Sequence, residues 1–260
     1  MKKILFLLSL LLILSCSSSE EEEKVPGTFK TNVLVEDITG TWCGWCPRVA
    51  YKLQELQKTT SQLIVVAAHY GSSGTLDYEK VNEIKSAFGV SSYPYAILNR
   101  SSKWNEQDSQ ITSLTGVAAT AGVAIESAIN NTNLTVTIKV GFSQDFTNLK
   151  YVIYLLENGL LADQANYADL GYGPANPLVD FEHKHVLRKA LTSGPLGDAI
   201  PDASSTNGSI FKETHTYTIP AEWNKDKMEI VAFVVKSDKS VINARHSDFG
   251  NTQTFQALSD

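Results

Sequence analysis

The sequence has little cysteine, few basic residues and no long apolar run. Its 260 residues include three cysteines, Cys16, Cys43 and Cys46, and 22 basic residues against 28 acidic ones, for a formal net charge of -6. Because no basic stripe offsets this acidic balance, we expect no nucleic-acid partner. The apolar run from residue 4 to residue 14 is too short to span a bilayer as a helix.

That apolar run has the features of a secretory signal. A basic pair, Lys2 and Lys3, precedes it, and it ends in LLILSC, where a serine stands directly before Cys16. This ending resembles the lipobox of bacterial lipoproteins, whose cysteine is acylated and becomes the new N-terminus; a plain signal with a chance cysteine is the alternative. We expect residues 1–15 to be a signal peptide and residues 16–25 to be a lipidated acidic tether.

The part from residue 26 to residue 120 alternates between strand and helix patterns. Short apolar runs rich in β-branched residues predict buried strands, and apolar residues three or four apart predict helices. Strands that alternate with helices indicate an α/β unit with parallel pairing at its start. The expected order is strand Val33–Ile38, helix Pro47–Lys58, strand Leu63–Ala68, helix Leu76–Phe88, strand Tyr95–Leu98 and a closing helix over Asp108–Ala119.

Residues 121–260 change to a period of two. Between Leu134 and Val140, apolar residues alternate with threonine and lysine, which is typical of half-buried strands. Several such strands with turn residues between them predict an antiparallel β-sandwich of the immunoglobulin-like kind. A long insert near residues 160–202 carries Gly-Pro and Asn-Pro steps, and we expect it to be irregular. Further expected strands are Tyr151–Leu156, Phe211–Ile219, Met228–Val235 and Val241–Ala244.

Two cysteines remain in the stretch TGTWCGWCPR, residues 39–48. A pair at this spacing is a redox centre, half a zinc site or an inert disulfide. Zinc lacks ligands, since no further cysteine remains and no histidine stands nearby at ligand spacing, so we expect no metal and no cofactor. The pair opens the helix that follows the first strand, and we expect this helix to begin close to Cys43, so that its free N–H groups and dipole favour a thiolate there. We therefore expect Cys43 to be the attacking sulfur and Cys46 the more buried, resolving one.

The stretch WCGWCP resembles the redox motif of the thioredoxin superfamily. The resemblance covers about residues 33–119 and implies a thioredoxin-like domain. It also implies a buried acid beneath the pair, for which Asp37 is the candidate and Glu36 its neighbour. A cis-proline before a central strand is implied as well, at Tyr93-Pro94. The dipeptide Gly44-Trp45 between the cysteines differs from that of thioredoxin itself, which leaves reductant, oxidant and isomerase open.

Two tryptophans and three histidines complete the set of candidates. Trp42 and Trp45 flank the first cysteine and are either core aromatics or an apolar rim for a substrate peptide. His69 ends an expected strand near the pair, as a satisfied polar residue or a proton carrier. His183 and His185 alternate, so on a strand they share a face, as a metal pair or as solvated surface.

The whole arrangement is similar to a family of outer-membrane lipoproteins of Gram-negative bacteria, described as 28-kDa-type outer membrane proteins. The lipobox, the stretches EDITGTWCGWCP and YPYAILNR, the all-β second half and the stretch HVLRKALT (residues 185–192) carry this resemblance. It implies an outer-membrane protein held by lipid on the periplasmic or cell-surface face. We expect an oxidoreductase that exchanges disulfides with envelope protein thiols; the alternative is a surface binding or structural lipoprotein that uses the thioredoxin-like domain as a scaffold.

Overall fold

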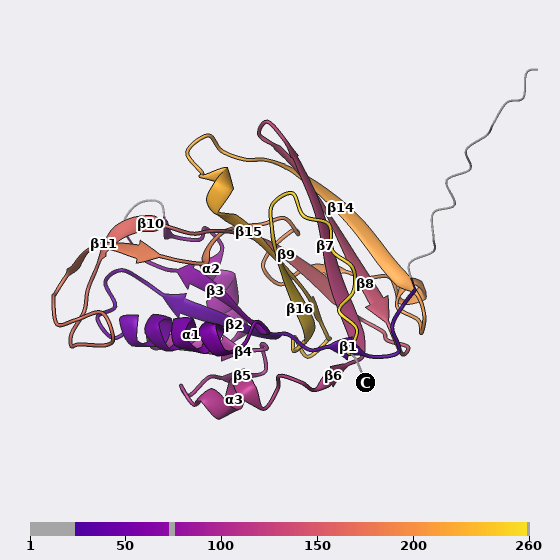
Figure 1. The fold of residues 1–260 in the computed structure, drawn as a ribbon, viewed down its shortest axis with the longest axis horizontal. Coiled ribbons are helices and arrows are strands. Elements are labelled where there is room, and N and C mark those ends of the chain that lie inside the picture. Colours follow the sequence, from indigo (N-terminus) through magenta and orange to yellow (C-terminus); the bar gives the residue numbers. More distant parts are fainter. Residues whose placement is uncertain (1–23, 73–75, 259–260) are drawn as a thin grey trace, which may run out of the picture.

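The computed structural model of the protein describes residues 24–72 and 76–258 (Figure 1). The expected signal peptide, Cys16 and most of the tether lie outside the described residues. Within the described ranges, no helix is both long enough and apolar enough to cross a membrane.

A nine-stranded mixed sheet runs through the molecule and joins both halves of the chain (Figure 1). Within it, β2 and β3 pair in parallel, as do β3 and β12, while the other neighbours are antiparallel. The order is β16 (Val241–Asp248), β15 (Met228–Val235), β9 (Lys150–Glu157), β12 (Val186–Ala190), β3 (Leu63–His69), β2 (Val33–Thr39), β4 (Tyr95–Leu98) and β5 (Ser102–Lys103), with β13 (Asp198–Ala199) paired to β9.

The insert near residues 160–202 is more regular than predicted, and this corrects the expectation of irregular structure. It contributes β12 to the large sheet and a separate hairpin of β10 (Leu160–Gln164) and β11 (Leu178–His183). The stretch HVLRKALT contains β12, which connects β3 to β9. The backbone N–H of Ala67 donates to the carbonyl of His185 at 2.8 Å across this junction.

Strands on both sides of the expected domain boundary share one core. Side chains of β2 and β3, among them Leu34 and Val66, pack in one cluster with Tyr154 of β9 and Phe233 of β15. Separating the halves would expose these apolar side chains to water. The boundary at residue 120 stays a prediction, and it falls where the chain passes from β6 (Ala118–Ala119) to β7 (Ala121–Asn130).

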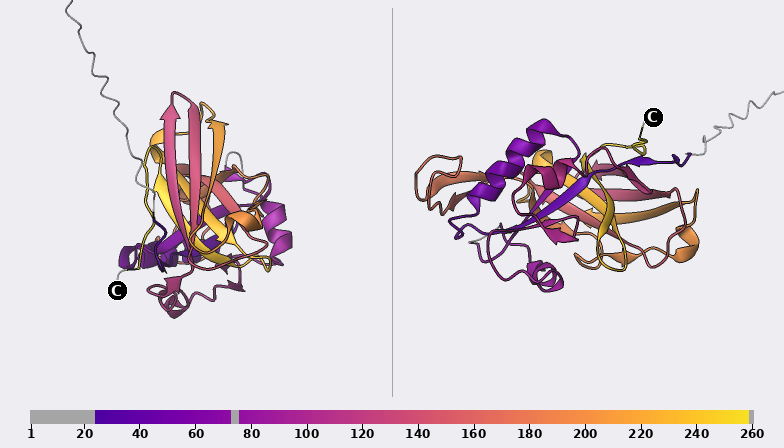
Figure 2. Two further views of the ribbon diagram at one scale, coloured as in Figure 1. Left: turned by 90° about the vertical axis from the view of Figure 1, so that its right-hand side faces the viewer. Right: turned by 90° about the horizontal axis from the view of Figure 1, so that it is seen from below.

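A three-stranded sheet of β14, β8 and β7 packs against the β9–β15 part of the large sheet (Figure 2). The four apolar residues that alternate between Leu134 and Val140 point into the core between the two sheets, because alternate side chains of a strand share a face. This layer and the β10–β11 hairpin lie at opposite ends of the molecule (Figures 1 and 2). The remaining strands of this sheet are β8 (Asn133–Phe142) and β14 (Ile210–Thr218).

The helix α1 (Pro47–Thr59) covers one face of β2 and β3 through Val49, Leu53 and Leu56. Its bounds agree with the predicted helix, and the proline at its first position suits a helix start.

Two other predicted helices are shorter than expected. The helix α2 (Val81–Ala87) lacks its first predicted turn, because Asp77 forms a bridge beside His69 and Tyr78 N–H donates to the carbonyl of His69. The helix α3 (Asp108–Thr112) ends early, and the residues beyond it reach β6, which pairs with β1 (Phe29–Lys30). Short 3-10 turns with described bounds include Asp202–Ser204 and Lys225–Lys227.

The alternation along β2 decides between the two acids of VLVEDI. Val33 and Val35 belong to the cluster beneath α1, whereas Leu34 and Ile38 belong to the core on the opposite face. Asp37 therefore lies on the α1 side, close to the cysteine pair, since residues two apart share a face.

Glu36 faces the other way and forms a buried ion pair. Its two oxygens accept from Arg100 Nε and Nη2 at 2.7 and 2.8 Å. The hydroxyl of Tyr154 also donates to Glu36 Oε1, at 3.2 Å. A bidentate, hydrogen-bonded pair is the arrangement that best offsets the cost of burying two charges.

Candidate redox site at the disulfide

Cys43 and Cys46 form a disulfide at the carboxyl end of β2. The chain turns after Thr39, and the N–H of Cys43 donates to the carbonyl of Gly40 at 3.0 Å. The helix α1 begins at Pro47, with Cys46 at its N-cap position. The expectation that the helix begins close to Cys43 is therefore wrong, because both cysteines precede the helix. The N-terminus of the helix lies at Cys46.

Both sulfur-bearing residues are buried, Cys43 at 5% exposure and Cys46 at 2%. Cys46 is the more buried of the two, as expected, but Cys43 is also largely shielded from solvent. The reason lies in the insert, whose hairpin crosses the cysteine loop. A reagent in solution thus reaches neither cysteine freely.

The cover is a backbone and side-chain contact between the end of β10 and the loop TWCGWC. The N–H of Ala165 donates to the carbonyl of Thr41 at 2.8 Å, and the N–H of Tyr167 donates to the carbonyl of Gly44 at 3.0 Å. The Tyr167 ring lies over Gly44 so closely that a Cβ added there would come within 2.3 Å of it. A glycine is therefore required at this close approach.

Gln164 adds a side-chain contact beneath this cover. Its buried Nε2 donates to the carbonyl of Cys43 at 3.1 Å and lies 3.4 Å from the carbonyl of Gly40. Together with the two backbone bonds, this holds the segment Gln164–Tyr167 against the cysteine loop. Gln164 stands 121 residues after Cys43 and 124 residues after Gly40, so this contact joins distant parts of the chain.

Asp37 lies below the pair and has the electrostatic properties of a proton-exchanging group. Burial, and to a smaller extent the charge of Glu106, raises the pKa of Asp37 to about 7. Its Oδ1 has no hydrogen-bond partner among the described residues. Asp37 and Cys46 line the same cavity of about 50 Å³, which is large enough to hold water. The carboxyl group of Asp37 therefore titrates near neutral pH on a cavity that Cys46 also lines.

Three histidines line the same cavity, and two of them, His69 and His183, contact each other. His69 Nε2 and His183 Nδ1 are 3.3 Å apart, so one ring donates to the other. Burial, reinforced by the neighbouring His183, lowers the pKa of His69 to about 3, and burial lowers that of His183 to about 4. Both rings are therefore neutral at pH 7. Their outer nitrogens, Nδ1 of His69 and Nε2 of His183, lack partners in the described part of the chain.

His185 lines the same cavity but does not join the contact between His69 and His183. It follows β11 with a positive φ of 54°, and its Nδ1 lies 2.9 Å from Oε2 of Glu229. The predicted alternation fails because the strand ends at His183. Of the two, His183 is the buried one, so the interpretation as solvated surface is wrong for that residue.

The aromatic residues near the pair are surface residues. Trp42 is 46% exposed and Trp45 45%, so neither is a core aromatic. The Trp42 ring contacts Tyr93 edge-to-face at 5.1 Å, and the peptide bond between Tyr93 and Pro94 is cis, as the thioredoxin resemblance implied. Trp45 contacts Tyr167 at 5.8 Å. These rings form an apolar rim at the edge of the covered disulfide.

Sequence reasoning missed the part of the site that the insert supplies. Gln164 and Tyr167 stand more than 100 residues beyond the cysteines, in a segment without a redox motif. His183 is a candidate from the sequence, but its pattern does not place it beside the cysteine pair. The length of the insert was the one available signal, because long loops inside a compact domain are often functional.

A family profile described as Outer membrane protein Omp28 matches residues 81–253. HBP35 of Porphyromonas gingivalis is similar in structure, with a TM-score of 0.68 and 19% identity over 87% of this chain and 77% of that one, so the two share a fold. A domain of the outer membrane lipoprotein Omp28 from Porphyromonas gingivalis matches with a TM-score of 0.35 and 17% identity over 52% of this chain and 100% of that one. A search of curated sequences finds no significant match.

Proposed function

The chain belongs to the Omp28 family of outer membrane proteins, and we propose that it acts at that membrane as a thiol–disulfide oxidoreductase. The observation that carries the proposal is Asp37, an unpaired buried carboxyl group on the same cavity as the Cys43–Cys46 disulfide. An unpartnered carboxyl group under a disulfide is costly to bury unless it exchanges protons there. The proposed substrates are protein thiols or disulfides of the envelope, and the proposed anchor is a lipid on Cys16.

The reaction follows ordinary thiol–disulfide exchange. A substrate thiolate attacks Cys43 Sγ, the bond between Cys43 and Cys46 breaks, and Cys46 leaves as a thiolate that takes a proton from Asp37. A second substrate thiolate then attacks the substrate sulfur of the mixed disulfide and releases Cys43. The substrate is thereby oxidised to a disulfide and the pair is reduced; the reverse sequence reduces a substrate disulfide.

We also propose that residues 26–120 form a thioredoxin-like domain and that the strands of the sandwich are immunoglobulin-like. The order β2, α1, β3 with parallel pairing, and the cis bond at Pro94, support the first. Trp42 and Tyr93 would position the substrate chain beside the pair.

A second candidate function is favoured by the burial of Cys43. If the disulfide is never reduced in the folded protein, it serves to hold the cysteine loop under the segment Gln164–Tyr167. The protein is then a binding or structural lipoprotein, and the thioredoxin-like part is its scaffold.

Equilibration of the full chain with glutathione redox buffers separates the two candidates. An oxidoreductase gives a reversible transition at about -120 to -270 mV, the range of known thiol–disulfide enzymes, with the fold intact by circular dichroism. A pair that is reduced only when the protein unfolds establishes the structural function instead. In parallel, Cys46→Ser should trap envelope proteins on Cys43, whereas Cys43→Ser should trap few or none.

A further inference from the structure

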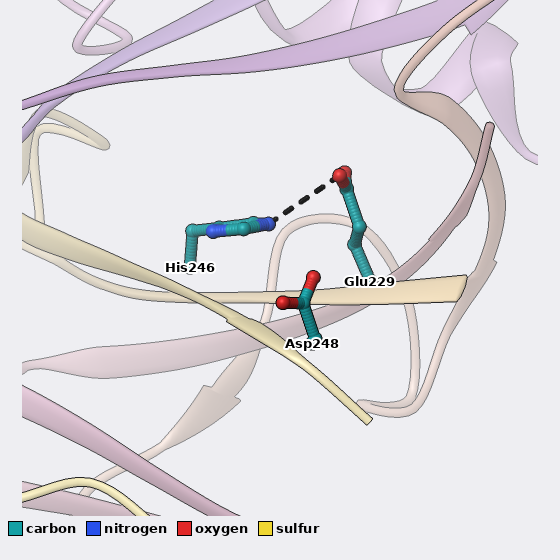
Figure 3. Close-up of side chains that lie close together, drawn as sticks. All are labelled: Glu229, His246 and Asp248. Atoms are coloured by element: carbon teal, nitrogen blue, oxygen red, sulfur yellow. Dashed lines mark ion pairs between the residues drawn. The ribbon is translucent and has the colours of Figure 1, made fainter. Parts of the chain in front are cut away.

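Three side chains with metal-ligand atoms lie together at the edge of the nine-stranded sheet, far along the chain from the disulfide (Figure 3). Glu229 is on β15, and His246 and Asp248 are on the edge strand β16. Glu229 stands directly opposite Asp248, and His246 lies two residues from Asp248 on the same strand. The three side chains therefore share one face of the sheet.

Their geometry is close to what a metal ion needs. One ligand atom from each residue lies within 4.8 Å of the other two. His246 Nε2 is 3.5 Å from Glu229 Oε1. Ligand atoms placed tetrahedrally at about 2.0–2.1 Å from zinc stand about 3.4 Å apart, so these two already have a suitable separation. Asp248 is exposed, and its side chain can move the remaining distance.

The charges also favour a cation between the strands. Two carboxylates directly opposite each other on antiparallel strands repel, which destabilises the pairing unless positive charge lies between them. His185 Nδ1 lies 2.9 Å from Oε2 of Glu229, on the side away from His246. This contact fixes the orientation of the Glu229 carboxylate, as the outer partners of metal ligands do.

We propose that Glu229, His246 and Asp248 bind a divalent transition-metal ion such as Zn²⁺. One imidazole and two carboxylates are ligands that zinc accepts, whereas Mg²⁺ and Ca²⁺ prefer oxygen ligands alone. The side toward solvent is open, and a neighbouring cavity of about 590 Å³ gives access for water or another ligand at the fourth position.

The surroundings limit the affinity of this site. Lys184, Lys225 and Lys227 line the same cavity, and their positive charge opposes the binding of a cation. A three-ligand site of this kind exchanges its metal with solvent more readily than a closed four-ligand site. The alternative is a metal-free ion pair between Glu229 and His246.

Zinc titration of the full chain tests the proposal. Isothermal calorimetry at pH 7.5 would use Cys16→Ala protein without reductant, so that the oxidised pair Cys43–Cys46 supplies no thiolate ligand. We expect one saturable Zn²⁺ per chain and no saturable Mg²⁺. His246→Gln and Asp248→Asn should each weaken binding at least tenfold, since losing one of three ligands removes a direct metal bond.

His215→Ala is the matched control, because this histidine lies on β14 beside Tyr151 and should leave the affinity unchanged. Bound Zn²⁺ should also raise the melting temperature of the parent protein and not that of Asp248→Asn. Absence of stoichiometric binding, or equal affinity in either ligand variant, overturns the proposal. Neither result depends on whether the disulfide is redox-active.

Discussion

His69 and His183 stand 114 residues apart in the chain, yet their ring nitrogens lie 3.3 Å from each other inside the protein. His69 ends β3 and His183 ends β11, so the pair connects the large sheet to the hairpin that covers the disulfide. Both imidazoles are neutral, and protonating either one would place a charge in a buried pocket. The contact between hairpin and sheet is therefore sensitive to acid.

We expect the free energy of unfolding to decrease as the pH falls from about 6.5 to about 4. In this window the unfolded chain protonates both histidines at their ordinary pKa of 6.5, while the native protein keeps them neutral, so the unfolded state binds more protons. His183→Asn should reduce the pH slope by about one proton, or about 1.4 kcal/mol per pH unit. Urea denaturation at several pH values measures this slope.

Asp37 contributes to the same slope with the opposite sign. Its pKa is raised from 3.8 to about 7, so between these values the native protein holds a proton that the unfolded chain has lost. Asp37→Asn should therefore steepen the loss of stability in acid. Equal slopes for the parent and both variants would show that neither Asp37 nor His183 has the assigned pKa.

Asp37→Asn should also slow the release of Cys46 from its disulfide with Cys43. An amide cannot exchange a proton with the leaving sulfur, whereas the carboxyl group with a pKa of about 7 can. Stopped-flow reduction of the disulfide between pH 6 and pH 8 should lose its inflection near pH 7 in the variant. A rate profile that keeps this inflection would remove Asp37 from the mechanism.

Gly44→Ala should open the cover over the disulfide. The new Cβ would lie 2.3 Å from the Tyr167 ring. The ring must therefore move, and with it the hydrogen bond that the N–H of Tyr167 donates to the carbonyl of residue 44. We expect reduction by dithiothreitol to become several-fold faster, and Tyr167→Ala to act in the same direction. Gly27→Ala is the matched control, since a Cβ there meets nothing within 4 Å. Unchanged rates in both cover variants would mean that the segment does not limit access.

Glu36→Gln should destabilise the protein by about 3–5 kcal/mol, because it leaves the buried guanidinium of Arg100 without its counter-charge. The loss should appear as a lower urea midpoint with the disulfide still formed. Glu55→Gln, which breaks the exposed pair with Lys58, provides the comparison and should leave the midpoint unchanged. A loss below about 1 kcal/mol for Glu36→Gln would show that Arg100 finds another partner.

Cys16→Ala should release the protein from membranes. The proposed anchor is a lipid on Cys16, and alanine offers no sulfur to which the lipid can be attached. Fractionation after a carbonate wash should move the variant to the soluble fraction. If it still pellets with membranes, the lipid is not the anchor.

The local patterns of the chain determined its elements and its cysteine pair. The stretch VLVEDI, with its β-branched and apolar residues, predicts a buried strand, and Pro47 is typical of a first helical turn. The alternation from Leu134 to Val140 predicts a half-buried strand. These features depend on neighbours in sequence, which is why the bounds of β2, α1 and β8 lie close to those expected.

Contacts between distant residues decided the rest. Leu76–Phe88 has a helical pattern, but Asp77 and Tyr78 gain partners at His69, so the tertiary contact replaces the first helical turn. The insert carries no motif, yet Gln164 and Tyr167 bury Cys43. No local pattern encodes such a contact, because its energy arises between segments that are far apart in the sequence and are brought together by the sheet, in which β12 lies between β3 and β9.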